Sequence, residues 1–85
     1  MVQTEAMGYD VQVVVTLLKP PSEAVMSALD HSFGKAGHKH GTKTVELTEH
    51  VSMPSEDDAI EFVRALVMDA VPEGSKITQI SASPN

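Results

Sequence analysis

Chemically reactive side chains are concentrated between positions 34 and 43, where the sequence is Gly-Lys-Ala-Gly-His-Lys-His-Gly-Thr-Lys. Its glycines leave backbone amides accessible beside ammonium and imidazole groups, and this combination suits a bound phosphate or carboxylate. One interpretation of the segment is therefore a site for a small anion. The candidate ligand-binding residues are Lys35, His38, Lys39, His40 and Lys43. The alternative interpretation is a solvated connection between two elements.

A metal site is the other chemistry that this segment suggests. His38 and His40 would point to the same side of an extended chain, a spacing compatible with a shared metal ion. A tight zinc site needs three or four ligands in fixed geometry, which a glycine-rich loop supplies poorly. The chain has no cysteine, so disulfides and Cys-ligated zinc are excluded. The sequence therefore predicts no metal site and no cofactor.

A second group of reactive side chains lies around His50 in an alternating segment. Glu46 is on the same side of that pattern, and Asp10 occupies the polar side of an earlier alternating segment. We expect these segments to be adjacent, parallel strands, which would let His50, Glu46 and Asp10 converge. A histidine beside a carboxylate is the minimum for general acid–base catalysis, so these three are the catalytic candidates. The alternative is a water-facing sheet rich in threonine.

The elements that position these residues follow from periodicity. Alternation of apolar and polar residues predicts strands over 9–17, 44–53 and 75–82. Ile77 and Ile80 can both face inward in the last of these strands only if it contains a bulge.

Two helices are predicted between the strands. Ser22 and Ser55 are the expected N-caps, and Asp58 lies three residues after Ser55. Apolar residues then recur every three or four positions up to Val71, where Pro72 ends the second helix.

The resulting order predicts an α+β domain with two helices on one face of a mixed sheet of three or four strands. This is the βαββαβ ferredoxin-like arrangement, with a second strand near 36–42 that is short or absent. We expect a flexible N-terminal tail over 1–7, one domain over 8–82 and a C-terminal tail over 83–85.

Composition limits the classes of partner that the chain is expected to bind. The 85 residues include twelve acidic and six basic ones, a net charge of −6 that argues against general nucleic-acid binding. No apolar run is long enough to span a membrane, and the start lacks the features of a signal peptide, so we expect a cytoplasmic protein. Val14, Leu18 and Ile80 on the uncovered sheet face could pack against a second copy, which would give a homodimer.

Three functions remain open from the sequence. The first is a small non-catalytic module that binds an anionic ligand or a protein partner, because no nucleophile motif, Walker-type loop or dinucleotide fingerprint is present. The second is a small dimeric enzyme that uses His50 as acid or base in a polar pocket on the free sheet face. The third is a structural or partner subunit that binds another chain through Met26, Met68 or an open sheet edge.

Overall fold

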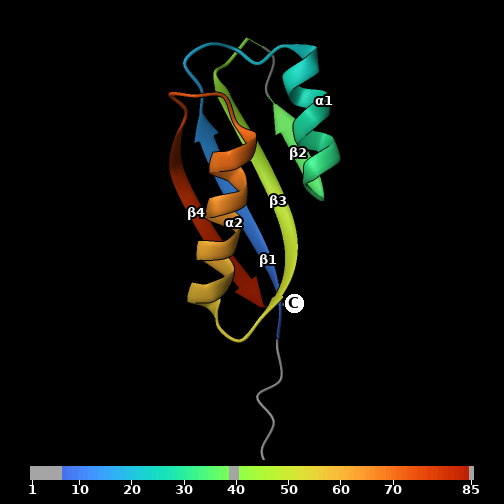
Figure 1. Cartoon of the computed structure of the whole chain (residues 1–85), viewed down its shortest axis with the longest axis vertical. Helices are drawn as coiled ribbons and strands as arrows, with labels where there is room; N and C mark the ends of the chain where they lie inside the picture. The colour runs from blue at the N-terminus through green and yellow to red at the C-terminus, as the bar shows by residue number, and fades with distance from the viewer. Residues whose placement is uncertain (1–6, 39–40, 85) are drawn as a thin grey trace, which may run out of the picture.

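A computed structural model describes residues 7–38 and 41–84 of the chain. The elements follow in the order β1 (Met7–Thr16), α1 (Glu23–Ser32), β2 (Lys35–His38), β3 (Thr44–Met53), α2 (Glu56–Ala70) and β4 (Lys76–Pro84). Both helices lie on one face of a four-stranded sheet with the strand order β2-β3-β1-β4 (Figure 1). The predicted ferredoxin-like α+β fold is therefore confirmed, and β1 begins at Met7 and β4 ends at Pro84, slightly beyond the predicted domain limits.

The prediction that β1 and β3 run parallel is wrong, because they are antiparallel. The α1 crossover carries the chain from β1 to β2 and leaves one strand position between them. β3 fills that position as the hairpin partner of β2, so it runs opposite to both of its neighbours. The central strands still share a polar face, because antiparallel pairing also aligns side chains across the ladder.

Of the segment 36–42, which could have been either strand or loop, the part up to His38 forms a short strand and Gly41 and Thr42 lie outside it. β2 contains four residues and pairs with β3 from Lys35 opposite Thr48 to His38 opposite Val45. The lower half of β3, from Glu49 to Met53, extends past β2 and has no strand on that side within the described residues.

Both predicted caps are present. The Ser22 Oγ accepts a hydrogen bond from the Val25 N–H, and the Ser55 Oγ accepts one from the Asp58 N–H, each at 3.2 Å. These bonds satisfy amides that a helix N-terminus would otherwise leave without a partner.

The last strand contains a bulge, which is the condition for both Ile77 and Ile80 to face inward. Val15 pairs with Ile77 and Val14 pairs with Gln79, which leaves Thr78 as the extra residue. Its hydroxyl donates to the Val14 carbonyl oxygen at 3.2 Å. The bulge turns both Ile77 and Ile80 toward the core, where they pack partly buried.

This placement corrects the expected apolar patch on the uncovered face. Ile80 pairs with buried Val13 and faces the helices, whereas Leu18 lies in the loop after β1 and is 69% exposed. Val14 alone of the three belongs to the uncovered face, where it is half-buried.

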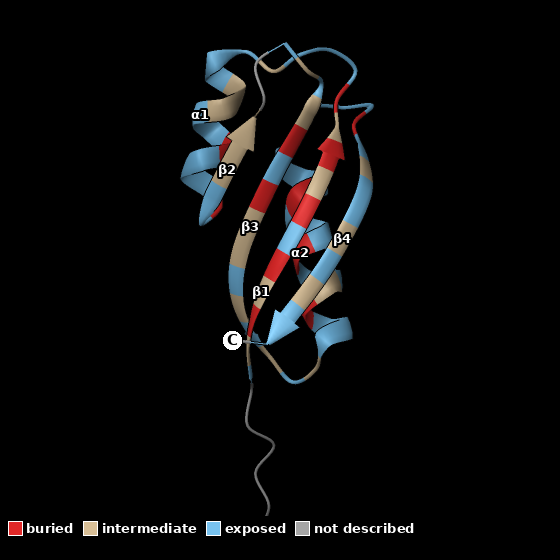
Figure 2. Cartoon of the chain, turned by 180° about the vertical axis from the view of Figure 1, so that it is seen from behind, coloured by how far each residue is buried: buried red, intermediate tan, exposed pale blue. Residues whose placement is uncertain are grey.

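The core lies between the sheet and the helices. The buried strand residues are Tyr9, Val11, Val13 and Val15 of β1 with Val45 and Leu47 of β3. The helices and their ends contribute Leu29, Phe33, Ala59, Val63, Val67 and Val71. Within residues 7–38 and 41–84, no helix covers the opposite sheet face, as Figure 2 shows from behind.

Candidate functional site

The uncovered face of the sheet carries polar side chains in rows set by strand register. The central row crosses all four strands, with Lys35 opposite Thr48, Thr48 opposite Gln12 and Gln12 opposite Ser81. Residues that are directly opposite in a ladder point to the same face. An ammonium group, two hydroxyls and a carboxamide are therefore aligned across the open face.

A shallow hollow lies beside this row because Gly37 has no side chain. Gly37 pairs with Glu46, and a Cβ built on it would find its nearest neighbour, the Glu46 carbonyl oxygen, at 3.9 Å. The residues that line the hollow are Gln12, Val13, Lys35, Gly37, Glu46, Leu47 and Thr48. The side chains of Val13 and Leu47 are buried on the helix side, so the polar residues define the chemistry of the hollow.

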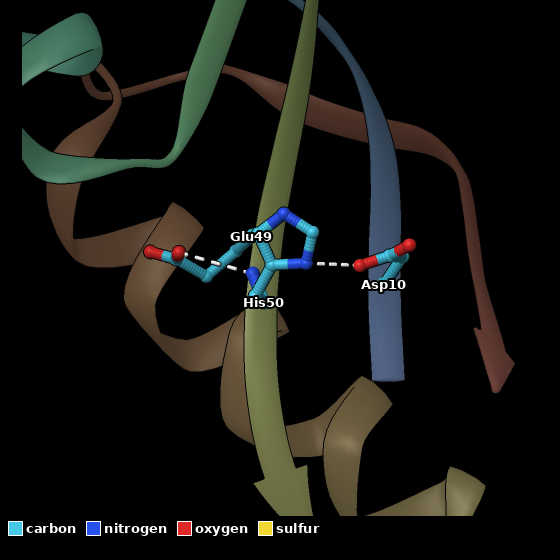
Figure 3. A network of polar contacts seen from close by, with 3 residues as sticks. All are labelled: Asp10, Glu49 and His50. Atoms are coloured by element: carbon cyan, nitrogen blue, oxygen red, sulfur yellow. Dashed lines mark hydrogen bonds and ion pairs between the residues drawn. The ribbon is translucent and has the colours of Figure 1, made fainter. Parts of the chain in front are cut away.

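The next row brings two catalytic candidates into contact. Asp10 pairs with His50, and the His50 Nδ1 forms an ion pair with the Asp10 Oδ1 when the imidazole is protonated (Figure 3). The His50 N–H donates to the Glu49 carboxylate at 3.1 Å, at the β3 edge that extends past β2. This N–H therefore points away from β1, which makes Asp10 and His50 a non-hydrogen-bonded pair. Such pairs bring opposite side chains closest together.

The environment of this pair is open. The side chain of His50 is 66% exposed and that of Asp10 is 38% exposed. Water at the pair weakens its electrostatic interactions, whereas catalytic stabilisation of charge depends on excluding water. Ser83 is the next residue in the row but lies on the far side of Asp10 from His50. The row therefore lacks the contact between histidine and hydroxyl that activates a nucleophile.

The residues of the predicted anion site that belong to β2 lie on opposite faces of the sheet. Lys35 faces the open side with Thr48, whereas His38 pairs with buried Val45 and faces the helix side. The His38 Nε2–H donates to the Thr42 carbonyl oxygen at 2.7 Å. The imidazole is thus used in closing the β2–β3 connection.

The other residues of that predicted site are not gathered with Lys35. Lys43 is exposed in the turn before β3, where its carbonyl oxygen accepts a hydrogen bond from the Leu17 N–H at 2.8 Å. Lys39 and His40 lie outside the described residues. Within residues 7–38 and 41–84, no three His, Asp or Glu side chains are grouped to hold a metal ion.

The hollow at Gly37 is the feature that sequence reasoning missed. A glycine inside a strand often marks a close approach of another group. The sequence left open whether residues 35–38 form a strand, so the meaning of Gly37 is clear only from the structure. Glu46, expected beside His50 as an acid–base partner, instead lines this hollow two rows away.

Comparison with protein-family models, with curated proteins and with solved structures finds no match to this chain. In the part of the chain that the structure describes, neither helix has the length and apolar character needed to cross a membrane. The geometry of the site is therefore the basis for the proposed function.

Proposed function

We propose that this chain is a non-catalytic binding module that holds a small polar ligand on its open sheet face, over Gly37. The observation that carries the proposal is the hollow over Gly37, whose polar lining residues are Lys35, Glu46, Gln12 and Thr48. A few convergent polar groups around a concave surface are typical of small-molecule sites.

The charges around the hollow favour a ligand with both signs of charge. Lys35 and Glu46 are diagonal neighbours across the β2–β3 ladder, roughly 7–8 Å apart by standard sheet geometry. Neither forms an ion pair with another residue in 7–38 or 41–84. An anionic group of the ligand would bind Lys35, and an ammonium group would bind Glu46.

The net charge of the chain supports the same ligand class. A protein with a net charge of −6 repels a ligand with several negative charges at long range. A small zwitterion with balanced charges, such as a free amino acid, avoids that repulsion. Gln12 and Thr48 would then supply hydrogen bonds that fix its orientation.

The test compares affinities for a panel of free amino acids and inorganic phosphate. Gly37→Val places methyl groups in the open hollow without a backbone clash, so the variant should fold and bind at least about tenfold more weakly, a loss of about 1.4 kcal/mol. Lys35→Gln should also weaken binding, whereas the matched variant Lys43→Gln should bind like the wild type. Unchanged affinity in Gly37→Val would refute the site. If only Lys43→Gln weakens binding, the ligand binds the glycine-rich connection over 34–43 and not the hollow.

A second candidate function, acid–base catalysis, is favoured by one observation, the contact between Asp10 and His50. Asp10 would orient the imidazole, and His50 would accept or donate a proton. Hydrolysis of an activated ester such as p-nitrophenyl acetate provides the test. If His50→Gln abolishes turnover that the wild type sustains above background, catalysis is supported. Equal rates in both proteins would reject it.

A further inference from the structure

The two edges of the sheet are protected to different extents. The β2 edge has only four residues, and α1 packs against that strand (Figure 1). The β4 edge is nine residues long, and no described element lies beyond it (Figure 2). A long free edge is a template for pairing with another strand, and proteins usually shorten, cover or charge such edges.

The backbone of β4 presents hydrogen-bonding groups outward along this edge. Pro84 lies opposite Tyr9 but has no N–H to donate, so this is a non-hydrogen-bonded pair. The backbone nitrogen and carbonyl group of Pro84 therefore point away from β1. Alternation along the strand then turns the N–H and C=O groups of Ala82 and Ile80 outward as well. The features that hinder pairing with another strand lie near the two ends of β4. They are the bulge at Thr78 and the proline at the last position.

An apolar groove runs beside the same edge on the helix side. Its lining residues are Arg64, Met68, Ile77, Thr78, Gln79 and Ile80. Met68 is 52% exposed there, above the partly buried isoleucines. The side chains of a strand added beside β4 would therefore contact Met68.

Charge indicates which partner fits. β4 contains no carboxylate, and its single charged residue, Lys76, lies at its first position. The acidic first turn of α2, Glu56–Asp58, lies at the end of the molecule where β4 finishes (Figure 1). If a second copy pairs with β4 in antiparallel fashion, Lys76 of each copy lies at the end of the molecule that carries the acidic turn of the other. The Lys76 side chain is on the open face of the sheet, because Lys76 pairs with Thr16, so it forms no direct contact with that turn on the helix side. The charges at each end of the joined strands are nevertheless opposite, and no carboxylate lies along β4, which reduces the repulsion between two chains of charge −6.

We propose that β4 is a homodimer interface, in which it pairs antiparallel with β4 of a second copy and joins two four-stranded sheets into one. The symmetry is two-fold, and Met68 of each copy covers the shared edge. This interface is independent of the ligand site over Gly37. An interface this narrow is at the low end of specific interface sizes, so we expect a dissociation constant of about 10 μM or weaker.

The first test measures amide hydrogen exchange and sedimentation as protein concentration rises. The amides of Ile80 and Ala82 should exchange more slowly at high concentration, in step with the appearance of dimer. A protein that stays monomeric at all concentrations would overturn the proposal and leave the edge to a different chain. A dimer without protection of these two amides would overturn it as well, because another surface would then be in contact.

Matched variants separate loss of the interface from loss of the fold. Met68→Lys places a charge beside β4, whereas Leu66→Lys places one at an exposed position of α2 outside the groove. We expect Met68→Lys to raise the dimer dissociation constant at least about tenfold and Leu66→Lys to leave it unchanged. Equal effects of the two variants would contradict the interface. Ala82→Pro removes an outward N–H and should give a folded monomer, with folding checked by circular dichroism.

Discussion

Strand register decides, residue by residue, which polar side chains meet on the uncovered face. The sequence predicted that Asp10 and His50 share this face, because alternation assigns every second residue to one side. Glu46 and His50 lie two rows apart because they are four residues apart in one strand. The sequence did not predict that Glu46 would lie beside Gly37, because that depends on how β2 and β3 are aligned. Face assignment is a local property, whereas register depends on the whole sheet.

The contact between Asp10 and His50 should contribute little to stability. Both side chains are substantially exposed, and exposed ion pairs are worth less than about 1 kcal/mol. We therefore expect Asp10→Asn to change the free energy of unfolding by no more than this amount, measured by urea denaturation at low and high salt. A larger loss would indicate that the pair is shielded from water, which would favour the catalytic function.

Two glycines should respond in opposite ways to alanine. Gly74 has φ +89°, so Gly74→Ala should destabilise the protein by about 1–2 kcal/mol through backbone strain. The added Cβ would also contact the Leu18 side chain, but this side chain is exposed and can move aside. Gly37→Ala is the matched control, since Gly37 is in a strand with open space at its Cβ, and it should be neutral or stabilising. Urea denaturation of both variants tests the contrast.

At the scale of elements, local signals predicted most of the structure. The strand over 44–53 and the helix capped by Ser55 were predicted from alternation, spacing and capping. The spacing of Ile77 and Ile80 showed that they could share a face only through a bulge in β4, but Ile80 was expected on the uncovered face, and the structure has the bulge. The orientation of β1 relative to β3 was predicted wrongly, because strand direction depends on the path of the chain and not on residue pattern.

The cap of α2 gives a direct test of this local reasoning. Ser55→Ala removes the hydroxyl that accepts from the Asp58 N–H and should lower the free energy of unfolding by about 1 kcal/mol. Ser52→Ala, at an exposed position of β3, should have a much smaller effect. Equal losses in the two variants, measured by thermal denaturation, would show that the cap adds nothing to stability.

At the scale of the whole molecule, the described elements leave one sheet face and the β4 edge of the sheet uncovered. We assign the face to a small ligand and the edge to a second copy. The sequence predicted an uncovered sheet face, but neither the hollow at Gly37 nor the identity of the open edge could be located from it, because both depend on the order and alignment of the strands. The sequence did indicate Met68 and an open edge as partner contacts, although it did not connect them.

Assembly through β4 should make thermal stability depend on protein concentration. Dimer formation stabilises the folded state by mass action, so the Tm of the wild type should rise with concentration. Met68→Lys should remove most of that dependence, while Leu66→Lys should retain it. A wild-type Tm that does not change with concentration, in differential scanning calorimetry, would argue against a dimer of folded chains.

The most direct test of the ligand-binding claim is an NMR titration of isotope-labelled wild-type protein with free amino acids and inorganic phosphate. If the open face binds a zwitterion, one or more amino acids should shift the amide resonances of Lys35, Gly37 and Thr48 in a saturable way, and phosphate should shift them less. If no probe shifts these amides, or if the shifts lie only in the groove beside β4, the proposed site over Gly37 is wrong.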